Sequence, residues 1–496
     1  MRSRTQLTWG MWMVTLWAAC LAAAVRPAAS AAAEPLPQAL VSCINDGAED
    51  QYTTYKDFAY KKPVRLKLRK GWWSAKPAAA PVTVVCGLNP DRLNQLESQC
   101  RRWHGPISAS VYAVVRAAKA GELLAAEQAQ RLEEAEANVA AFHAKMDALE
   151  AGCQLDVLLL YEVVLDDVME VMFPVNALRN FALLQARTEL VSMVDVDLLV
   201  SNSLFDWLQT EANMKLLRDG TAKKQVYVLP AFETAPHANE TEAHALADGA
   251  SGMSKAKLSE LVQKRVVYQF ALYLFWQGHN STDYKKWFAT STPYPIKWHD
   301  GYEPWFIIGR HANPFYDESF RGYGWNKVTH VANILKQRYE FVAHPAGFLI
   351  HRQHGRSAAD KMYQAQKVAY EADVKANKIT RDKPNNNLAG LTHRFRDDVY
   401  AALDKGGYEP LLDGGIKACL RVLPWWKELQ QGGQPPGDPQ QREQQQQQQQ
   451  AAGETQQQQE APEGDGAPGG GARRSRLRRL AEELARRLMV RRRRRA

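Results

Sequence analysis

Residues 154–197 read QLDVLLLYEVVLDDVMEVMFPVNALRNFALLQARTELVSMVDVD, and this stretch decides the fold class. An apolar run at 154–164 is followed by an amphipathic stretch at 176–187 and by a second apolar run at 190–194. Their lengths and compositions indicate a strand, a helix and another strand. Such a unit is typical of a sheet that contains parallel strands joined by crossover helices.

The alternation extends upstream of residue 154. It predicts strands at 82–86 and 107–115 and helices at 89–103 and 117–150. Regular alternation predicts an α/β domain with a parallel or mixed central sheet flanked by helices, in which ligands bind at the carboxyl ends of the strands. Beyond residue 200 the pattern is less regular, with aromatic-rich loops at 276–325 and a helical stretch near 365–404. We therefore expect one large domain over residues 81–430.

The net charge of +9 is concentrated at the end of the chain. Residues 472–496 contain twelve arginines and two glutamates, a net +10, so the remaining chain carries about −1. A nearly neutral body argues against a basic groove for nucleic acid, and no nucleic-acid partner is expected. The leucines of this Arg-rich tail lie at helical spacing, which suits an anionic membrane surface or an acidic partner, or else a solvated tail.

Three further segments have no core-forming pattern. Residues 1–26 carry a charge-free apolar run behind two arginines and are predicted to be a signal-anchor or, if cleaved near 28–31, a signal peptide. Residues 27–80 are Ala/Pro-rich and then basic, which indicates a stem. Residues 431–471 are rich in Gln, Pro and Gly and predict a disordered linker.

The N-terminal signal places the body in the secretory lumen, where cysteines can pair. Five cysteines lie in the body, at positions 43, 86, 100, 153 and 419, so up to two disulfides and one free thiol are expected, with the connectivity open. Two sequons, at Asn239 and Asn280, can accept glycans.

The sharpest chemical feature is the D-x-D triplet Asp195-Val196-Asp197, which ends the apolar run at 190–194. The triplet alone is common by chance, so its position carries the argument. Carboxylates at the carboxyl end of a strand can hold a hard divalent cation that bridges a diphosphate. A second apolar run, at 348–351, ends in His351, and imidazole with carboxylates suits manganese. His344 and His354 are its competitors.

Aromatic, glycine and acidic residues are mixed at 298–305 and 314–327. Sugar sites use aromatic faces against pyranose rings, and an inverting transfer needs one carboxylate as general base. We choose Asp317 as this base, with Glu303 and Glu318 as rivals that sequence alone does not rank.

Seven blocks in order carry a resemblance to a known family. They are VTVV at 82–85, W-x-GPIS at 103–108, P-x-NALRN-x-A at 174–182, DVDLLVS at 195–201, GYEPW at 301–305, YDESFRGYGWNK at 316–327 and H-P-x-GFLIH at 344–351. The series resembles glycosyltransferase family 49. This resemblance implies a GT-A-type, Rossmann-like nucleotide-sugar-binding fold, an inverting mechanism, a UDP-sugar donor and manganese (Mn²⁺).

The resemblance also assigns residues. Asp195, Asp197 and His351 match the metal site, and Asp195 also belongs to the donor site. The other expected donor-binding residues are Asn176, Arg179, Asn180, Trp325, Asn326 and Lys327. The glutamine-rich linker, the Arg-rich tail and an insertion at 235–254 depart from the family pattern, so the acceptor and linkage are not inherited.

Together with these observations, the resemblance implies a transferase that moves a sugar, glucuronate by preference, from UDP to a glycan or glycoprotein acceptor. We expect a single-pass type II protein of the Golgi membrane with a luminal catalytic domain, or a secreted one if the N-terminal segment is cleaved. Two alternatives stay open. One is the same machinery with UDP-linked xylose, galactose or N-acetylglucosamine, and the other is a catalytically silent glycan-binding scaffold.

Overall fold

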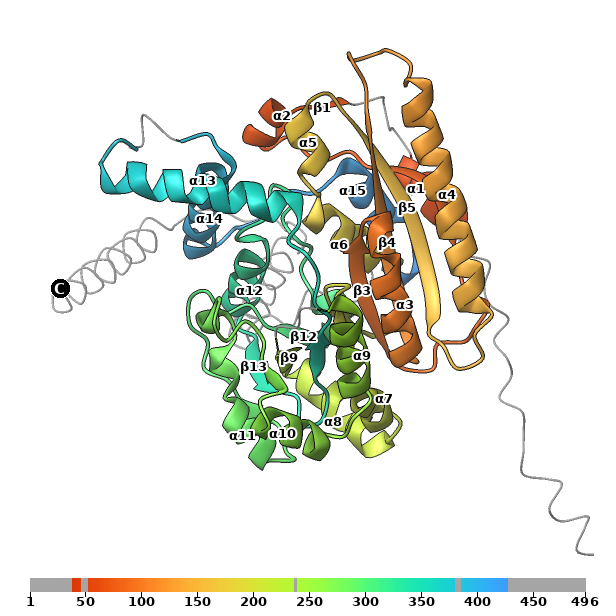
Figure 1. Cartoon of the computed structure of the whole chain (residues 1–496), viewed down its shortest axis with the longest axis vertical. Helices are drawn as coiled ribbons and strands as arrows, with labels where there is room; N and C mark the ends of the chain where they lie inside the picture. Colours follow the sequence, from red (N-terminus) through yellow and green to blue (C-terminus); the bar gives the residue numbers. More distant parts are fainter. Residues whose placement is uncertain (1–37, 46–51, 236–238, 380–384, 427–496) are drawn as a thin grey trace, which may run out of the picture. The chain divides into compact units, whose positions relative to one another are not determined.

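The structure is a computed structural model that describes residues 38–45, 52–235, 239–379 and 385–426 (Figure 1). Its centre is a ten-stranded mixed sheet in which nine strands follow the order β1-β5-β4-β3-β6-β12-β8-β13-β11, and β2 pairs with β5. The expected α/β class with a mixed sheet is confirmed. The strands are β1 Tyr52–Thr53, β2 Lys67–Trp72, β3 Val82–Leu88, β4 Pro106–Arg116, β5 Gln154–Val164, β6 Leu190–Met193, β8 Gln225–Leu229, β11 Tyr294–Pro295, β12 Trp305–Gly309 and β13 Glu340–Ala343.

The strand order reverses beside β3. From β3 the chain moves outward through β4 to β5, and then returns to place β6 on the opposite side of β3, all in parallel. Beyond β6, strand β12 runs antiparallel to its neighbours β6 and β8. In open α/β sheets, ligands bind in the crevice outside the strand ends at such a switch point. The chain leaves β6 at this point directly into Asp195.

Helices cover both faces of the sheet at β3 to β5. Val84 and Cys86 of β3 face α3 (Leu93–Arg102) and α4 (Ala126–Asp147), whereas Val85 faces α6 (Val175–Gln185). This alternation follows from the period of two in a strand. A Cβ placed on Gly87 would lie 2.8 Å from the Cβ of Leu178, so this glycine permits the close approach of α6 to the sheet.

The predicted helix at 117–150 is shorter in the structure. Strand β4 continues to Arg116, Gly121 takes a φ of +82° in the connection, and α4 begins only at Ala126. The helix formers at 117–125 therefore lie in the connection between β4 and α4, where the positive φ of Gly121 is incompatible with a continuous right-handed helix.

A second, four-stranded sheet has the order β10-β9-β14-β7. It comprises β7 Leu198–Val200, β9 Ala231–Thr234, β10 Val267–Gln269 and β14 Leu349–His351. The chain passes from β6 of the large sheet to β7 of the small sheet across Asp195–Asp197, so the D-x-D triplet lies where the two sheets meet.

The remaining helices surround these sheets. The insertion at 235–254 contains α9 (Glu240–Ser251), which packs on β14 and β9. The helical stretch near 365–404 is two helices, α13 (Ala358–Lys375) and α14 (Leu388–Lys405). These two helices pack against each other, and α14 also packs against α12 (Asn326–Lys336). The other helices are α1 Gln38–Asn45, α2 Tyr55–Ala59, α5 Asp167–Val171, α7 Asn202–Leu208, α8 Glu211–Ala222, α10 Lys255–Gln263, α11 Tyr284–Ala289 and α15 Gly414–Val422.

Part of the segment predicted as a stem belongs to the folded unit. Strand β2 pairs antiparallel with β5, and β1 pairs with β5 in parallel. Helix α1 packs against α15, and Cys43 of α1 is disulfide-bonded to Cys419 of α15. The sequence signal was weak because these elements are short and bury their apolar side chains against residues more than 80 positions away.

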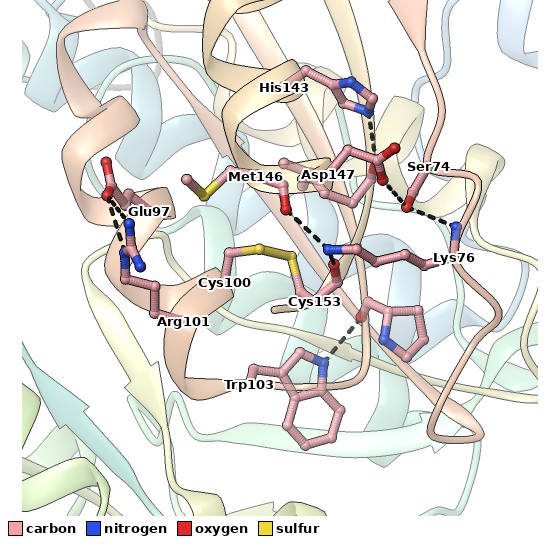
Figure 2. The surroundings of a disulfide bond; sticks show 12 residues. Ser74, Lys76, Glu97, Cys100, Arg101, Trp103, His143, Met146, Asp147 and Cys153 are labelled. Carbon is pink, nitrogen blue, oxygen red and sulfur yellow. Dashed lines mark hydrogen bonds and ion pairs between the residues drawn. A yellow bond between two sulfur atoms is a disulfide. The ribbon is translucent and has the colours of Figure 1, made fainter. Parts of the chain in front are cut away.

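A second disulfide, Cys100–Cys153, joins the end of α3 to the start of β5 (Figure 2). Beside it, Lys76 Nζ donates to the carbonyl oxygens of Met146 (2.9 Å) and Cys153 (3.4 Å). Lys76 thus binds a carbonyl oxygen in the last turn of α4, as cations do at helix C-termini, and links it to the residue that precedes β5. Of the described cysteines, Cys86 alone is free and it is buried, so two disulfides and one thiol are present, as the count predicted.

We expect Cys43→Ser to lower the free energy of unfolding by about 2–4 kcal/mol, because the bond closes a very long loop of the unfolded chain. Denaturant unfolding of the full chain measures the change. Cys419→Ser and the double variant should each show the same loss. Additive losses in the double variant would mean that the two thiols stabilise the fold separately rather than through their bond.

Arg321 and Glu162 form a buried ion pair that fixes the 316–327 segment to β5. Arg321 Nη1 and Nη2 donate to the two Glu162 carboxylate oxygens at 2.8 and 2.7 Å, and its Nη2 also donates to the Met172 carbonyl oxygen at 2.8 Å. Thr53 and Tyr112 donate to the same carboxylate at 2.6 and 2.8 Å. Burial opposes ionisation of Glu162, but Arg321 outweighs it and keeps its pKa below the usual value.

Arg321→Met should therefore destabilise the fold by about 3–5 kcal/mol, because it leaves the Glu162 carboxylate buried without its counter-charge. Adding Glu162→Met should recover much of this loss. Thermal unfolding of the three variants measures the effect. Lys215→Met, which breaks the exposed Lys215–Asp219 pair, is the matched control and should leave stability nearly unchanged. Equal losses of stability in Arg321→Met and Lys215→Met would contradict the prediction.

The predictions for residues 1–26, 431–471 and 472–496 lie outside the described residues. Among the helices that the structure describes, none is long and apolar enough to cross a bilayer.

Candidate active site

The D-x-D triplet forms a tight turn between the two sheets. Asp195 follows β6 by two residues, and its carbonyl oxygen accepts from the Leu198 amide at 2.9 Å as β7 begins. Antiparallel pairing of β6 with β12 aligns Ser192 with Ile307, which brings Trp305 at the start of β12 beside Asp195. The switch point of the large sheet thus presents both carboxylates on one short turn.

Helix α6 supplies one wall of the site. Asn176, Arg179 and Asn180 lie three and four positions apart, so they share one face of the helix, and all three are buried. Arg179 Nη1 donates to Asn176 Oδ1 (3.0 Å) and to Asn326 Oδ1 (2.8 Å). Asn176 and Asn180 bind the carbonyl oxygens of residues 317 and 316 at 2.7 and 2.8 Å. Helix α6 therefore positions the acidic 316–318 segment as well as Arg179.

Asp195 is held by two cations and an indole. Its carboxylate accepts from Arg179 Nη2 at 2.8 Å, from Trp305 Nε1 at 3.1 Å and from Lys327 Nζ at 3.3 Å. Lys327 Nζ also lies 3.6 Å from the centroid of the Trp305 ring. Burial alone would raise the pKa of Asp195, but Lys327 and then Arg179 outweigh it and hold the pKa well below its usual range. Asp195 is consequently a fixed negative charge.

Asp197 lies in a different cluster, with two histidines. Ligand atoms of Asp197, His351 and His354 all lie within 4.8 Å of one another. The register of the small sheet explains this, because His351 pairs with Leu198 and the Arg352 amide donates to the Asp197 carbonyl oxygen at 2.7 Å. One carboxylate and two imidazoles suit a divalent transition metal, so the donor set fits the expected cation.

The two imidazoles differ in their electrostatics. Burial lowers the pKa of His351, and the nearby Asp197 only partly offsets this effect. Burial also opposes protonation of His354, but its 2.5 Å hydrogen bond to Asp197 dominates and raises its pKa. Asp197 itself has a lowered pKa, since His354 and His351 together outweigh its burial. The cluster therefore keeps the Asp197 carboxylate ionised and the His351 imidazole neutral, which are the forms that bind a metal, whereas His354 must lose its proton when a cation binds.

The predicted metal residues are thus only partly brought together. Asp197 and His351 lie in one group, His354 joins them, and Asp195 lies outside the group because Arg179, Lys327 and Trp305 engage its carboxylate. His344, the other competitor, is buried and accepts backbone hydrogen bonds from residues 346 and 347 at 3.2 and 2.8 Å. His344 has a structural role.

Two of the three candidate bases are committed to structural hydrogen bonds. Asp317 is buried and accepts from the Ser319 amide at 2.9 Å and hydroxyl at 2.5 Å and from the Tyr408 hydroxyl at 2.7 Å. Glu318 accepts from Asn180 Nδ2 at 2.8 Å and from the Asp413 amide at 2.7 Å, and burial raises its pKa well above the usual value. Both carboxylates hold the 316–327 segment in place.

Glu303 has the opposite character. Its side chain is partly exposed, and no hydrogen bond to its carboxylate is found among the residues that the structure describes. Burial raises the pKa of Glu303, and the negative charge of Asp195 adds to this effect. The positive charges of Lys327 and Arg179 lower the pKa but do not outweigh burial. Glu303 lies two residues before Trp305, whose indole donates to Asp195, so it borders the same site as the D-x-D turn. A carboxylate with a raised pKa and free oxygens is suited to accept a proton.

The start of α12 contributes two of the three predicted donor residues. Asn326 accepts from Arg179, and Lys327 reaches Asp195. The Trp325 backbone takes a positive φ of 59°, and its ring lies against α14, where it contacts His393 (5.2 Å) and Arg396 (4.2 Å). Trp325 therefore shapes the turn into α12, while its ring is engaged elsewhere.

Sequence reasoning missed Trp305 and His279. The two rings stack at 5.1 Å with an interplanar angle of 1°, so His279 covers the indole that donates to Asp195. Burial lowers the pKa of His279 well below its usual value, and Lys327 adds to this effect. Trp305 closes the GYEPW block and could have been found from it, whereas nothing near His279 in the sequence marks its contact with a residue 26 positions away.

Comparison with known proteins agrees with this geometry. Residues 81–383 match the family model described as "Glycosyl-transferase for dystroglycan". The chain is 35% identical to mouse "Xylosyl- and glucuronyltransferase LARGE2" over 281 residues, which is 57% of this chain and 35% of that protein. It is 30% identical to human "Xylosyl- and glucuronyltransferase LARGE1" over 284 residues, 57% of this chain and 32% of that protein.

The matched region thus spans about a third of the length of these relatives. The family model, by contrast, covers more than half of this chain, including β3 to β14 and every candidate site residue. The chain belongs to glycosyltransferase family 49.

Proposed function

We propose that this chain is an inverting, metal-dependent glycosyltransferase that moves a sugar from a UDP-sugar to a glycan acceptor. The observation that carries the proposal is the grouping of Asp197, His351 and His354 at the switch point of the sheet, next to the cation-paired Asp195. The relatives are xylosyl- and glucuronyltransferases by name, so UDP-glucuronate is our first choice of donor and UDP-xylose the second.

Asp197, His351 and His354 would hold the cation, for which we propose Mn²⁺. When bound, that ion supplies positive charge to the diphosphate of the donor. Arg179 and Lys327 pair with Asp195, the other carboxylate of the triplet, and a guanidinium and an ammonium can pair with phosphate or with a donor carboxylate. Asp195 and Asn326 orient these two cations.

For the general base we propose Glu303 in place of Asp317, the residue chosen from the sequence. Inversion requires one carboxylate that removes the proton from the acceptor hydroxyl as the bond to the sugar forms. Glu303 has free oxygens and a raised pKa, whereas both Asp317 oxygens already accept hydrogen bonds from Ser319 and Tyr408. Glu318 is buried and positions α6 and Asp413.

The cellular setting is part of the same proposal. We place the chain in the Golgi membrane as a single-pass type II protein whose catalytic domain is luminal, with secretion if residues 1–26 are cleaved. The acceptor is a glycan or glycoprotein. The Arg-rich tail would contact an anionic membrane surface or an acidic partner, and no nucleic acid is involved.

The test is release of UDP by the purified full chain from a panel of UDP-sugars, with Mn²⁺, with other divalent cations and with EDTA. We expect turnover of UDP-glucuronate or UDP-xylose that EDTA abolishes and Mn²⁺ restores. Turnover that EDTA leaves intact would exclude the metal role. If a folded chain neither binds nor turns over any UDP-sugar, it acts as a glycan-binding scaffold instead.

A further inference from the structure

Four consecutive large apolar side chains are exposed in the loop between β10 and α11. Tyr273 is 78% exposed, Leu274 79%, Phe275 39% and Trp276 51%. We call residues 273–276 the aromatic loop. Soluble proteins seldom expose a contiguous apolar patch without a function, and such patches mark binding sites.

The loop is held in a defined shape. Ala271 takes a φ of 53°, the left-handed region that alanine rarely adopts, and its carbonyl oxygen accepts from the amides of Leu274 (3.1 Å) and Phe275 (2.8 Å). The Phe270 amide, just before it, donates to the Ala231 carbonyl oxygen of β9 at 3.0 Å. The rings of Tyr268 and Tyr273 lie 5.9 Å apart. A strained backbone that hydrogen bonds and packing hold in place is typical of functional loops.

The aromatic loop is continuous with the candidate active site. The Glu303 amide donates to the Gly278 carbonyl oxygen at 2.9 Å. A Cβ placed on Gly278 would lie 2.6 Å from the Phe275 ring and 3.4 Å from Glu303 Cγ, so Phe275 and Glu303 border the same glycine. His279, the next residue, stacks on Trp305, which donates to Asp195. Gly278 therefore lies between the Phe275 ring of the aromatic loop and the proposed base.

The chemistry of the loop suits a sugar ring rather than an anionic surface. No Lys or Arg lies within residues 266–284, although Lys264, Arg265, Lys285 and Lys286 flank this stretch in the sequence. Attraction to an anionic membrane depends on basic side chains, and the exposed rings have none next to them in the chain. Faces of aromatic rings are electron-rich and attract the weakly positive C–H groups on the face of a pyranose. Gln277 is also exposed here and can bind sugar hydroxyls.

We propose that Tyr273 and Trp276 form an acceptor subsite that packs on the sugar ring next to the one that receives the new residue. Phe275 joins this subsite to Glu303. The proposal rests on the proposed function, since Glu303 defines which end of the acceptor is the reacting one. It adds that the enzyme recognises an oligosaccharide of at least two rings, with the second ring bound through its apolar face.

The test uses the full chain and the double variant Tyr273→Ala/Trp276→Ala on an array of immobilised oligosaccharides graded by chain length. The probe is the array itself, with and without UDP and Mn²⁺. We expect the unmodified chain to bind glycans of two or more rings. The double variant should bind the same glycans with an affinity that is lower by about 5- to 50-fold. Trp276→Phe should restore part of it. Tyr60→Ala, which removes another exposed aromatic ring, is the matched control and should change nothing.

A second measurement separates this proposal from the proposed function. UDP release in the absence of acceptor should be the same in the unmodified chain and in the double variant, because the exposed rings lie outside the metal group. If neither the unmodified chain nor the double variant releases UDP, the proposed function is refuted but the subsite is not, because binding to the array needs no turnover. The subsite proposal would be overturned if the unmodified chain retained no glycan, or if the double variant retained as much glycan as the unmodified chain. A loss of binding to phosphatidylcholine vesicles in the double variant with unchanged glycan binding would also overturn it, because that result would assign the loop to a membrane.

Discussion

Asp197→Asn is expected to lower kcat/KM for sugar transfer by at least about 10³-fold, or roughly 4 kcal/mol of transition-state stabilisation. Asp197 is the carboxylate of the three-residue metal group, and its two neighbours are imidazoles, so no other carboxylate of that group can replace it. An amide keeps the size of the side chain but removes the negative charge that attracts the cation. UDP release at saturating Mn²⁺ measures the loss, and calorimetric titration with Mn²⁺ should show that metal affinity falls with it.

Three companion variants make this result specific. His351→Ala and His354→Ala should each weaken Mn²⁺ binding, because each removes one imidazole from the group. Asp219→Asn, on the exposed surface of α8, changes the charge equally and should leave activity unaltered. Full activity and unchanged Mn²⁺ affinity in Asp197→Asn would show that the cluster is not the metal site.

Glu303→Gln is expected to lower kcat by about 10²–10⁴-fold, the contribution of a positioned general base. Since its oxygens accept no hydrogen bond from the described residues, the substitution should leave thermal stability and the affinity for UDP nearly unchanged. Single-turnover transfer to an acceptor glycan measures the effect. Asp317→Asn is the informative comparison, because it breaks the hydrogen bonds from Ser319 and Tyr408 and should lower stability more than the rate. The reverse pattern would return the role of base to Asp317.

The pH dependence tests the same assignment. A base must be deprotonated, so activity should fall as the pH drops through the pKa of Glu303. Burial raises that pKa, which moves the acidic limb above the usual glutamate value of about 4.3. The limb should be present in the unmodified chain and absent from the residual activity of Glu303→Gln. A limb that persists unchanged in the variant would belong to another group.

The central strands were predictable because their signals are local. Strand β5 spans Gln154–Val164, as its apolar run predicted, and β3, β4 and β6 agree within two residues. The helix pattern at 176–187 gives α6, and its spacing alone places Asn176, Arg179 and Asn180 on one face. Periodicity depends on neighbours in the chain, so it can be read without knowledge of the fold.

The D-x-D turn was found for a related reason. Asp195 and Asp197 follow an apolar run, and the carboxyl end of a strand in an α/β sheet faces the ligand whatever the rest of the chain does. Their division of roles was not predictable. Arg179, Trp305 and Lys327 come from three distant elements to bind Asp195, and only the packing of α6, β12 and α12 around β6 brings them together.

Tertiary structure alone decided the remaining features. His354 joins His351 because β14 pairs with β7 in one register, and a shift by one residue would have turned the side chains of β14 to the other face. Glu303 is set apart from Asp317 and Glu318 because each of those two carboxylates accepts a hydrogen bond from a residue over 90 positions away, Tyr408 for Asp317 and Asp413 for Glu318. The pairing of Cys43 with Cys419 and of β2 with β5 likewise joins distant segments. The sequence by itself therefore determined the elements and the chemistry available at the end of β6, whereas long-range register and packing decided which side chains meet there.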